Sequence, residues 1–310
     1  MLTVVIPVYN EEPWIFENIG IIRNYILKTG IRYEVILIDD GSTDNTWQVL
    51  QKLAESYPGI KALRLSRNFG KEAALCAGLE AASGDACIIM DSDLQHPPEL
   101  IPEMVRLWKE DGYEVVEGVK ALRPQENLVN KVGASLFYSI LSKFSGFDIK
   151  QASDFKLLDK KVLQAWRSMN ERNTFFRGMS AWVGFKRVSI PFSTKNRAFG
   201  ESKWSLFKLF KLAINAITSF SSLPLQIVTI MGLIFLLGSL ILGVQTLYMK
   251  LRGIAYSGFT TVILLLLVIG SALMISLGII GTYIAKIYEE VKGRPRYIVA
   301  ERVESRIPES

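Results

Sequence analysis

Two aspartates separated by a single residue, Asp91 and Asp93, are the side chains whose type and spacing point most directly to chemistry. They follow the apolar run Ala86–Met90 and therefore lie where a buried strand would end. Carboxylate oxygens suit Mg²⁺ and Mn²⁺, which usually also take phosphate oxygens from a substrate. A bare pair of this kind also occurs in solvated loops, but here prolines shape the loop MDSDLQHPPEL and Gln95 can add an oxygen. We therefore expect Asp91, Asp93 and Gln95 to hold Mg²⁺ or Mn²⁺.

The elements that must position these acids alternate between short apolar runs and amphipathic stretches over residues 1–120. Strands are expected at residues 2–6, 34–38, 60–65 and 86–90, with helices between them. This alternation predicts the α/β class, with a mostly parallel sheet covered by helices on both faces. Ligands of such sheets bind beyond the carboxyl ends of the strands, where the pairs Asp39-Asp40 and Asp91-Asp93 both lie.

The C-terminal third has a different, strongly apolar character. Neither residues 223–249 nor residues 259–285 include a charged side chain. Each stretch exceeds the roughly 20 apolar residues that span a bilayer, so we expect a two-helix transmembrane hairpin within residues 223–288. Before it, the segment 200–222 places its leucine, phenylalanine and isoleucine side chains on one helical face, which favours a helix at the membrane interface over a core helix.

Charge around the hairpin predicts its orientation. The short linker contains Lys250 and Arg252, whereas the outer flanks contain a larger set of basic residues: Lys203, Lys208, Lys211, Lys286, Lys292, Arg294 and Arg296. Because basic flanks stay in the cytoplasm, we expect a multi-pass protein of the cytoplasmic membrane with the large domain and both termini inside. A strand is expected in the tail after Arg294, and a strand at 186–191 and a helix at 127–144 in the less regular middle region.

Composition narrows the possible functions. The net charge of +6 suits nucleic acid, anionic lipid or phosphorylated substrates, but a nucleic-acid binder would not explain the hairpin. The single histidine, His96, has no obvious partner and makes a histidine-rich metal site or a Ser-His-Asp triad hard to build. Cys76 and Cys87 lie in apolar stretches and are expected as buried thiols. The motifs G-x-G-x-x-G and G-x-x-x-x-G-K-[ST] are absent, which disfavours a dinucleotide oxidoreductase or a P-loop NTPase.

Four motifs occur in the order in which one enzyme family has them: IPVYNEE at 6–12, IDDGSTD at 38–44, DSDLQHPP at 91–98 and RAFGESKW at 197–204. With them, essentially the whole chain resembles a family 2 glycosyltransferase of the GT-A fold. Within that family it is most similar to the polyprenyl-phosphate glycosyltransferases, which include dolichyl-phosphate mannose synthases and bactoprenol glucosyltransferases. The C-terminal hairpin resembles the bactoprenol branch.

The resemblance implies a nucleotide-sugar site in the first three motifs. Its nucleotide pocket would be lined by Pro7, Tyr9, Asn10, Glu11 and Asp91. In isolation, residues 7–11 would equally suit an ordinary strand-to-helix turn. The resemblance also implies that Asp39 and Asp40 hold the uracil and the ribose, because carboxylates accept hydrogen bonds from base N–H groups and ribose hydroxyls.

Cationic side chains complete the implied site. Arg197 and Lys203 would clamp phosphate, with Ser202 as a further donor, since a guanidinium offers a fork of donors and an ammonium a point charge. Lys120, Arg123 and Lys131 would neutralise the lipid phosphate or the leaving diphosphate. The family usually has arginine near two of these positions, so the lysines at 120 and 131 depart from its pattern.

Asp154, in ASDFKLLD, is implied as a catalytic carboxylate beside Asp93. A phosphate monoester has a second pKa near 6, so at neutral pH it is mostly a dianion and needs little help from a base. Asp154 would then orient the acceptor or adjust the charge near the metal; a buried acid that caps a turn is the structural alternative.

The expected function is inverting transfer of a hexose, with glucose as first choice, from a UDP-sugar to polyprenyl (undecaprenyl) phosphate. The alternatives are a GDP-mannose-dependent polyprenyl-phosphate mannose synthase, a processive polysaccharide synthase, which would normally have Q-x-x-R-W and more spans, and an inactive membrane scaffold. The expected organisation is a GT-A catalytic domain at 1–199, an interface helix at 200–222, the hairpin with spans near 223–249 and 259–286, and a cytoplasmic tail at 289–310. The family further implies a homo-oligomer, possibly a tetramer, and a separate flippase for the product.

Overall fold

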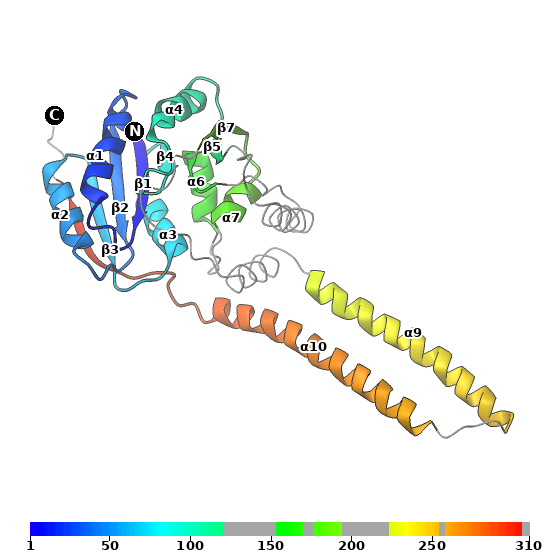
Figure 1. Ribbon diagram of the computed structural model, residues 1–310. Helices are drawn as coiled ribbons and strands as arrows, with labels where there is room; N and C mark the ends of the chain where they lie inside the picture. The colour runs from blue at the N-terminus through cyan, green and yellow to red at the C-terminus, as the bar shows by residue number, and fades with distance from the viewer. Residues whose placement is uncertain (121–152, 170, 172–175, 194–222, 254–257, 306–310) are drawn as a thin grey trace. The chain divides into compact units, whose positions relative to one another are not determined.

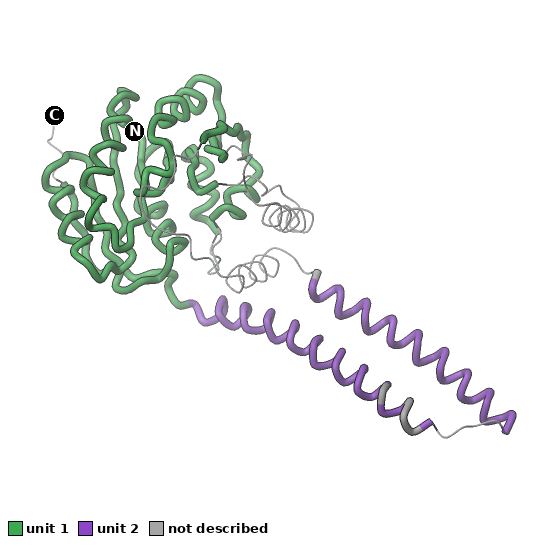
Figure 2. Tube along the Cα trace, viewed as in Figure 1, with its two compact units in different colours: residues 1–204, 294–310 green, residues 205–293 purple. Residues whose placement is uncertain are grey.

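A computed structural model describes residues 1–120, 153–169, 171, 176–193, 223–253 and 258–305. The chain divides into two compact units, drawn in different colours in Figure 2. Unit 1 contains residues 1–204 and 294–310, and unit 2 contains residues 205–293. The tail after the apolar segments therefore belongs to the same unit as the N-terminal part of the chain.

Unit 1 is built on one sheet of eight strands (Figure 1). The strands are β1 Leu2–Val8, β2 Tyr33–Asp39, β3 Ile60–Leu65, β4 Ala86–Ile89, β5 Val115–Lys120, β6 Lys156–Asp159, β7 Arg187–Phe192 and β8 Val299–Glu304. Their order across the sheet is β7-β5-β6-β4-β1-β2-β3-β8. The pairs β1–β2, β1–β4, β2–β3 and β5–β7 are parallel. Antiparallel pairing appears where β6 lies between β4 and β5, and where β8 closes the edge beside β3.

Helices cover both faces of this sheet. On one face lie α1 (Ile15–Leu27), α2 (Thr46–Ser56) and α4 (Ile101–Lys109), whose buried side chains share a core with β1 and β2. On the other face lies α3 (Lys71–Ala81), which contacts β1, β2 and α6 (Lys160–Arg167). A Cβ added at Gly78 of α3 would lie 2.3 Å from Cγ1 of Val5, so only glycine permits this close approach of helix and sheet.

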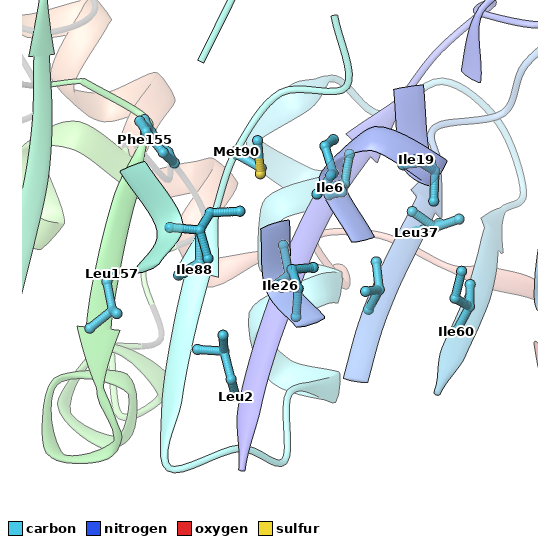
Figure 3. Close-up of a cluster of buried hydrophobic side chains, with 14 of the residues drawn as sticks. Leu2, Ile6, Ile19, Ile26, Leu37, Ile60, Ile88, Met90, Phe155 and Leu157 are labelled. Carbon is cyan, nitrogen blue, oxygen red and sulfur yellow. The ribbon is translucent and has the colours of Figure 1, made fainter. Parts of the chain in front are cut away.

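The main core explains the α/β pattern of the sequence. Alternate residues of β1, Leu2, Val4 and Ile6, are fully buried against the α1 side chains Ile19 and Ile26. Figure 3 shows this cluster extending across the sheet through side chains of β2, β3, β4 and β6. Because successive strand residues point to opposite faces, such strands are buried on both sides and read as continuous apolar runs. The predicted α/β class, with a mostly parallel sheet and helices on both faces, is confirmed.

Unit 2 contains the two long apolar helices α9 (Leu223–Leu251) and α10 (Phe259–Val291). They contact one another, and each contains a segment long and apolar enough to cross a membrane, Pro224–Leu251 and Leu265–Val291. None of either segment is buried within unit 2. A helix of this length whose leucines, isoleucines and valines face outward indicates association with a membrane, since such a surface is unfavourable in water.

The strands predicted from the sequence agree closely with the observed ones. The strand expected at 60–65 coincides with β3, and those at 2–6 and 34–38 extend by one or two residues into β1 and β2. The predicted tail strand is confirmed as β8. The helix expected at 127–144 and the interface helix at 200–222 lie outside the described residues.

Candidate active site

A cleft of about 320 Å³ opens where β1 and β4 end and α3 begins. Six of the residues predicted for the site line it: Pro7, Tyr9, Glu11, Asp40, Asp91 and Asp93. They come from three motifs that are far apart in the sequence. The parallel arrangement of β1, β2 and β4 brings the ends of these strands together, as expected for ligand sites in α/β sheets.

Lys71, the first residue of α3, joins two carboxylates at this cleft. Its Nζ lies 2.5 Å from Oδ1 of Asp91 and 3.0 Å from Oδ2 of Asp154. Burial alone would lower the pKa of Lys71, but the two carboxylates outweigh it and raise the pKa above its ordinary value. The Lys71 ammonium is therefore held between the predicted metal-binding motif and the predicted catalytic acid.

Arg177, on α7 (Phe176–Trp182), binds Asp154 from a second direction. Its Nε donates to Oδ1 of Asp154 at 2.7 Å, and its Nη2 donates to Oδ2 at 2.8 Å. Burial would raise the pKa of Asp154, but the hydrogen bonds and charges of Arg177 and Lys71 hold it far below its ordinary value. Asp154 is thus a buried carboxylate that is ionised at neutral pH and has two cationic partners.

His96, which sequence reasoning left without a partner, supports the loop of the aspartate pair. Its Nδ1 accepts a hydrogen bond from the backbone N–H of Asp91 at 3.0 Å. Its ring stacks on Phe155, with centroids 5.1 Å apart and planes at 9°, and meets the edge of Phe192. Burial lowers the pKa of His96, so the ring is neutral and its 3.9 Å approach to the Asp91 carboxylate is not an ion pair. The histidine holds the backbone at Asp91 and packs on Phe155, the residue after Asp154.

Glu11 reaches the same loop from the end of β1. Its Oε2 accepts a hydrogen bond from the hydroxyl of Ser92, between the two aspartates. Burial, reinforced by the charges of Asp93 and Asp91, raises the pKa of Glu11 to about 7. This carboxyl is therefore partly protonated near neutral pH, and it ties the first motif to the third.

Asp40 holds the loop that precedes α3. Its Oδ1 accepts the N–H of Phe69 at 2.8 Å, and its Oδ2 accepts the N–H of Gly70 at 2.9 Å. Burial outweighs these two hydrogen bonds and raises the pKa of Asp40. Asp40 therefore positions the turn that delivers Lys71, which sequence reasoning did not assign to it.

The neighbouring acid, Asp39, is fully buried at the end of β2. Its Oδ1 accepts the N–H of Ser42 at 2.9 Å. Its Oδ2 has no hydrogen-bond partner, although Nε of Arg64 lies 3.4 Å away. Asp39 does not itself line the cleft, although the next residue, Asp40, does. A buried acceptor without a donor is costly, so this oxygen suits a donor on a ligand that reaches it.

Asn10 shapes the first motif rather than facing the cleft. Its backbone adopts a positive φ of 53°, its N–H donates to Oγ of Ser42 at 2.9 Å, and its Oδ1 accepts the N–H of Thr43 at 2.9 Å. These bonds join the loops that follow β1 and β2. A Cβ at Gly41, whose φ is 68°, would lie 2.3 Å from the carbonyl carbon of Arg67, so the β2 loop also meets the β3 loop.

The carboxylates at this cleft fit a divalent ion. Within the described ranges there is no cluster of three or more His, Cys, Asp or Glu side chains at metal-binding separation. Asp91 and Asp93 nevertheless offer oxygens to the cleft, and the Lys71 ammonium shows that positive charge is stabilised there. Mg²⁺ typically uses one or two protein carboxylates and completes its shell with phosphate oxygens and water. The backbone N–H of Gln95 donates to Asp93 at 3.0 Å, and ligation by the Gln95 side chain stays a prediction.

Most of the remaining predicted phosphate ligands lie outside the residues that the structure describes. Lys120 is exposed at the end of β5 and does not line the cleft. Arg123, Lys131, Arg197, Ser202 and Lys203 lie outside the described residues. Their role as phosphate ligands stays a prediction.

Sequence reasoning missed two of the most closely engaged residues, Lys71 and Arg177. Lys71 follows Gly70 at the expected start of a helix beyond the third strand, a position from which the sequence could have placed it at the cleft. Arg177 lies on a short helix in the irregular middle region, and nothing in its spacing linked it to Asp154.

Comparisons with known proteins identify the family of the chain. Residues 3–162 match the family described as Glycosyl transferase family 2. An uncharacterized glycosyltransferase of Bacillus subtilis, YkcC, is 38% identical over 96% of this chain and 92% of its own length. The Prophage bactoprenol glucosyl transferase homolog of Escherichia coli is 36% identical over 96% of this chain and 98% of its own length. Among solved structures, glucosyl-3-phosphoglycerate synthase from Mycobacterium tuberculosis is 21% identical, covering 71% of this chain and 78% of its own, with a TM-score of 0.46. The chain belongs to glycosyl transferase family 2.

Proposed function

We propose that this protein transfers a hexose, most simply glucose, from a UDP-sugar to the phosphate of a polyprenyl lipid. Near-complete alignment with relatives named bactoprenol glucosyl transferases supports a polyprenyl carrier as the acceptor. The two apolar helices of unit 2 support the same choice, because such an acceptor is confined to a membrane.

The observation that carries the proposal is the double clamp on Asp154. Three N–H donors from Arg177 and Lys71 engage its two oxygens. A hydroxyl acceptor must lose its proton to a base during transfer, and a carboxylate held in this way is a very weak base. A phosphate monoester is already mostly a dianion at neutral pH, so it needs no such base. The site therefore suits a phosphate acceptor better than a hydroxyl acceptor.

The proposed reaction is a single displacement. A phosphate oxygen of the lipid attacks the anomeric carbon from the face opposite the nucleotide. The new C–O bond forms as the bond to the diphosphate oxygen breaks, so the anomeric configuration inverts. The nucleoside diphosphate leaves with the electron pair, and no proton has to move in this step.

The proposal gives a role to each of several predicted site residues. Asp91 and Asp93 would hold Mg²⁺ or Mn²⁺, which neutralises charge on the leaving diphosphate when bound. Asp39 would accept a base N–H, and Asp40 would keep Gly70 and Lys71 at the diphosphate. Arg197, Ser202 and Lys203 would bind phosphate, and Arg123 and Lys131 the acceptor.

The large unit would face the cytoplasm, so a separate protein would carry the product across the membrane.

The acceptor class is tested with two lipids that differ only in the phosphate. Purified protein in detergent receives radiolabelled UDP-glucose, Mg²⁺, and either undecaprenyl phosphate or undecaprenol. The proposal expects label in the lipid phase only with the phosphate. Transfer to undecaprenol at a comparable rate would contradict it, since that reaction requires a base.

A further inference from the structure

The edge strand β8 brings the carboxylate of Glu301 close to Arg64, which approaches Asp39 of the proposed nucleotide site. This strand begins seven residues, 292–298, after the end of α10, and it pairs antiparallel with β3. Its register places Glu301 opposite Arg64. Further contacts fasten the tail: the N–H of Ser66 donates to the carbonyl of Ile298 at 2.9 Å, and the N–H of Gly59 donates to Oγ of Ser305 at 3.0 Å. Glu301 is therefore held in a fixed position at the sheet edge.

Arg64 is shared between two carboxylates. Its Nη1 donates to Oε1 of Glu301 at 3.0 Å, a good charge-assisted hydrogen bond. Its Nε lies 3.4 Å from Oδ2 of Asp39, which is too long for a strong bond and leaves that oxygen without a hydrogen-bond partner. Trp47 completes the arrangement, since its Nε1 donates to Oε2 of Glu301 at 3.1 Å. The tail strand thus holds the guanidinium that would otherwise satisfy Asp39.

Asp39 is buried next to residues that line the cleft, although it does not line the cleft itself. Its partner on β1 is Val8, which lines the cleft, and the next residue, Asp40, lines it too. Under the proposed function, which this inference rests on, Oδ2 of Asp39 receives a base N–H from the donor nucleotide. Arg64 and the nucleobase therefore compete for one oxygen.

We propose that Glu301 is a positioning residue for nucleotide binding: it holds Arg64 away from Asp39 and so keeps Oδ2 available to the base. Without the Glu301 charge, Arg64 forms a full ion pair with Asp39, and the base must displace it. Strand β8 then has two roles: it closes the edge of the sheet, and through Glu301 it positions Arg64 beside the nucleotide site.

The test measures UDP binding by titration calorimetry on the full-length protein in detergent with Mg²⁺, with GDP alongside because guanine also has a ring N–H. Glu301→Gln keeps an oxygen for Trp47 but removes the charge, and binding should weaken about tenfold, the worth of one charge-assisted hydrogen bond. The double variant Arg64→Met/Glu301→Gln should regain most of that affinity, because the competing guanidinium is gone. Glu304→Gln, the same change on the same strand, should bind like the wild type.

Two results would overturn the inference: Glu301→Gln binding as tightly as the wild type, or a double variant no better than Glu301→Gln. The second would mean that Glu301 supports the sheet edge alone. If Glu301→Gln does not fold, Arg64→Met decides, since tenfold weaker binding there would show that Arg64 assists the nucleotide. The assay contains no acceptor, so it remains informative even if the lipid-acceptor proposal fails. A wild-type protein that binds neither UDP nor GDP would contradict both the proposed nucleotide-sugar donor and this inference.

Discussion

Arg177 holds both oxygens of Asp154, with Nε 2.7 Å from Oδ1 and Nη2 2.8 Å from Oδ2. Lys71 adds a third donor to the same carboxylate and links it to Asp91 at 2.5 Å. In this arrangement Asp154 organises two cations at the cleft. The sequence resemblance implies a catalytic carboxylate here, but Asp154 is poorly suited to act as a base. Burial would raise its pKa, yet Arg177 and Lys71 keep it far below its ordinary value.

Replacing Asp154 should change the rate of transfer without removing its pH dependence. Asp154→Asn removes the charge that Arg177 and Lys71 share, so we expect kcat to fall about tenfold to a hundredfold through misplaced charge. The wild-type rate should rise as pH increases through about 6, where the acceptor phosphate becomes a dianion. The same rise should persist in Asp154→Asn, as measured by initial rates from pH 5 to pH 8. A rise present in the wild type and absent from the variant would instead identify Asp154 as the titrating base.

Asp93 should be required for Mg²⁺ to strengthen nucleotide binding. Asp93→Asn removes a carboxylate from the cleft, so we expect transfer to fall at least about a hundredfold and Mg²⁺ to stop strengthening UDP binding. The exposed Glu103→Gln on α4 has the same change in charge and should behave like the wild type. Full Mg²⁺ stimulation of UDP binding in Asp93→Asn would place the ion elsewhere.

His96 should act through its acceptor nitrogen more than through its ring. An asparagine oxygen can accept the Asp91 N–H that Nδ1 now accepts, whereas phenylalanine keeps the stack on Phe155 and leaves that N–H unpaired. An unsatisfied buried donor costs about 1–3 kcal/mol, so His96→Phe should lose at least about tenfold in kcat/KM while His96→Asn retains most of it. Melting temperatures measured alongside separate loss of folding from loss of positioning. Higher activity in His96→Phe than in His96→Asn would show instead that the ring contact dominates.

Much of this site follows from the sequence because strand ends in a parallel sheet are predictable in space. The apolar runs before Asp39 and Asp91 predict two strands, β2 and β4, which pair with β1 from its two sides, so that their carboxyl ends lie near one cleft. The clamp on Asp154 could not be predicted in the same way, since Arg177 lies 23 residues away on a short helix that only tertiary packing positions. The place of β8 beside β3 depends likewise on a contact between chain segments more than 200 residues apart. Local patterns encode elements and their ends, whereas such long-range pairings emerge from packing.

Glu34 should make folding sensitive to acid. Burial alone would raise its pKa, but hydrogen bonds from Thr3 and Ser83 and the ion pair with Lys61 outweigh it and leave the pKa below its ordinary value. A group with a lowered folded pKa stabilises the native state above its unfolded pKa, about 4.3, and this stabilisation disappears as pH falls through the folded value. The melting temperature of Glu34→Gln should therefore lie below that of the wild type at neutral pH and converge with it in acid. A constant difference down to about pH 3 would contradict this assignment.

The transfer reaction itself is the most direct test of the account. Full-length protein in detergent is given undecaprenyl phosphate, Mg²⁺ or Mn²⁺, and radiolabelled UDP-glucose, UDP-galactose, UDP-N-acetylglucosamine or GDP-mannose, with Asp93→Asn run in parallel. The account predicts that label enters the lipid phase from UDP-glucose, and that EDTA and Asp93→Asn both abolish it. Folded protein that binds UDP yet transfers label from none of these donors to the lipid phosphate would contradict the central claim.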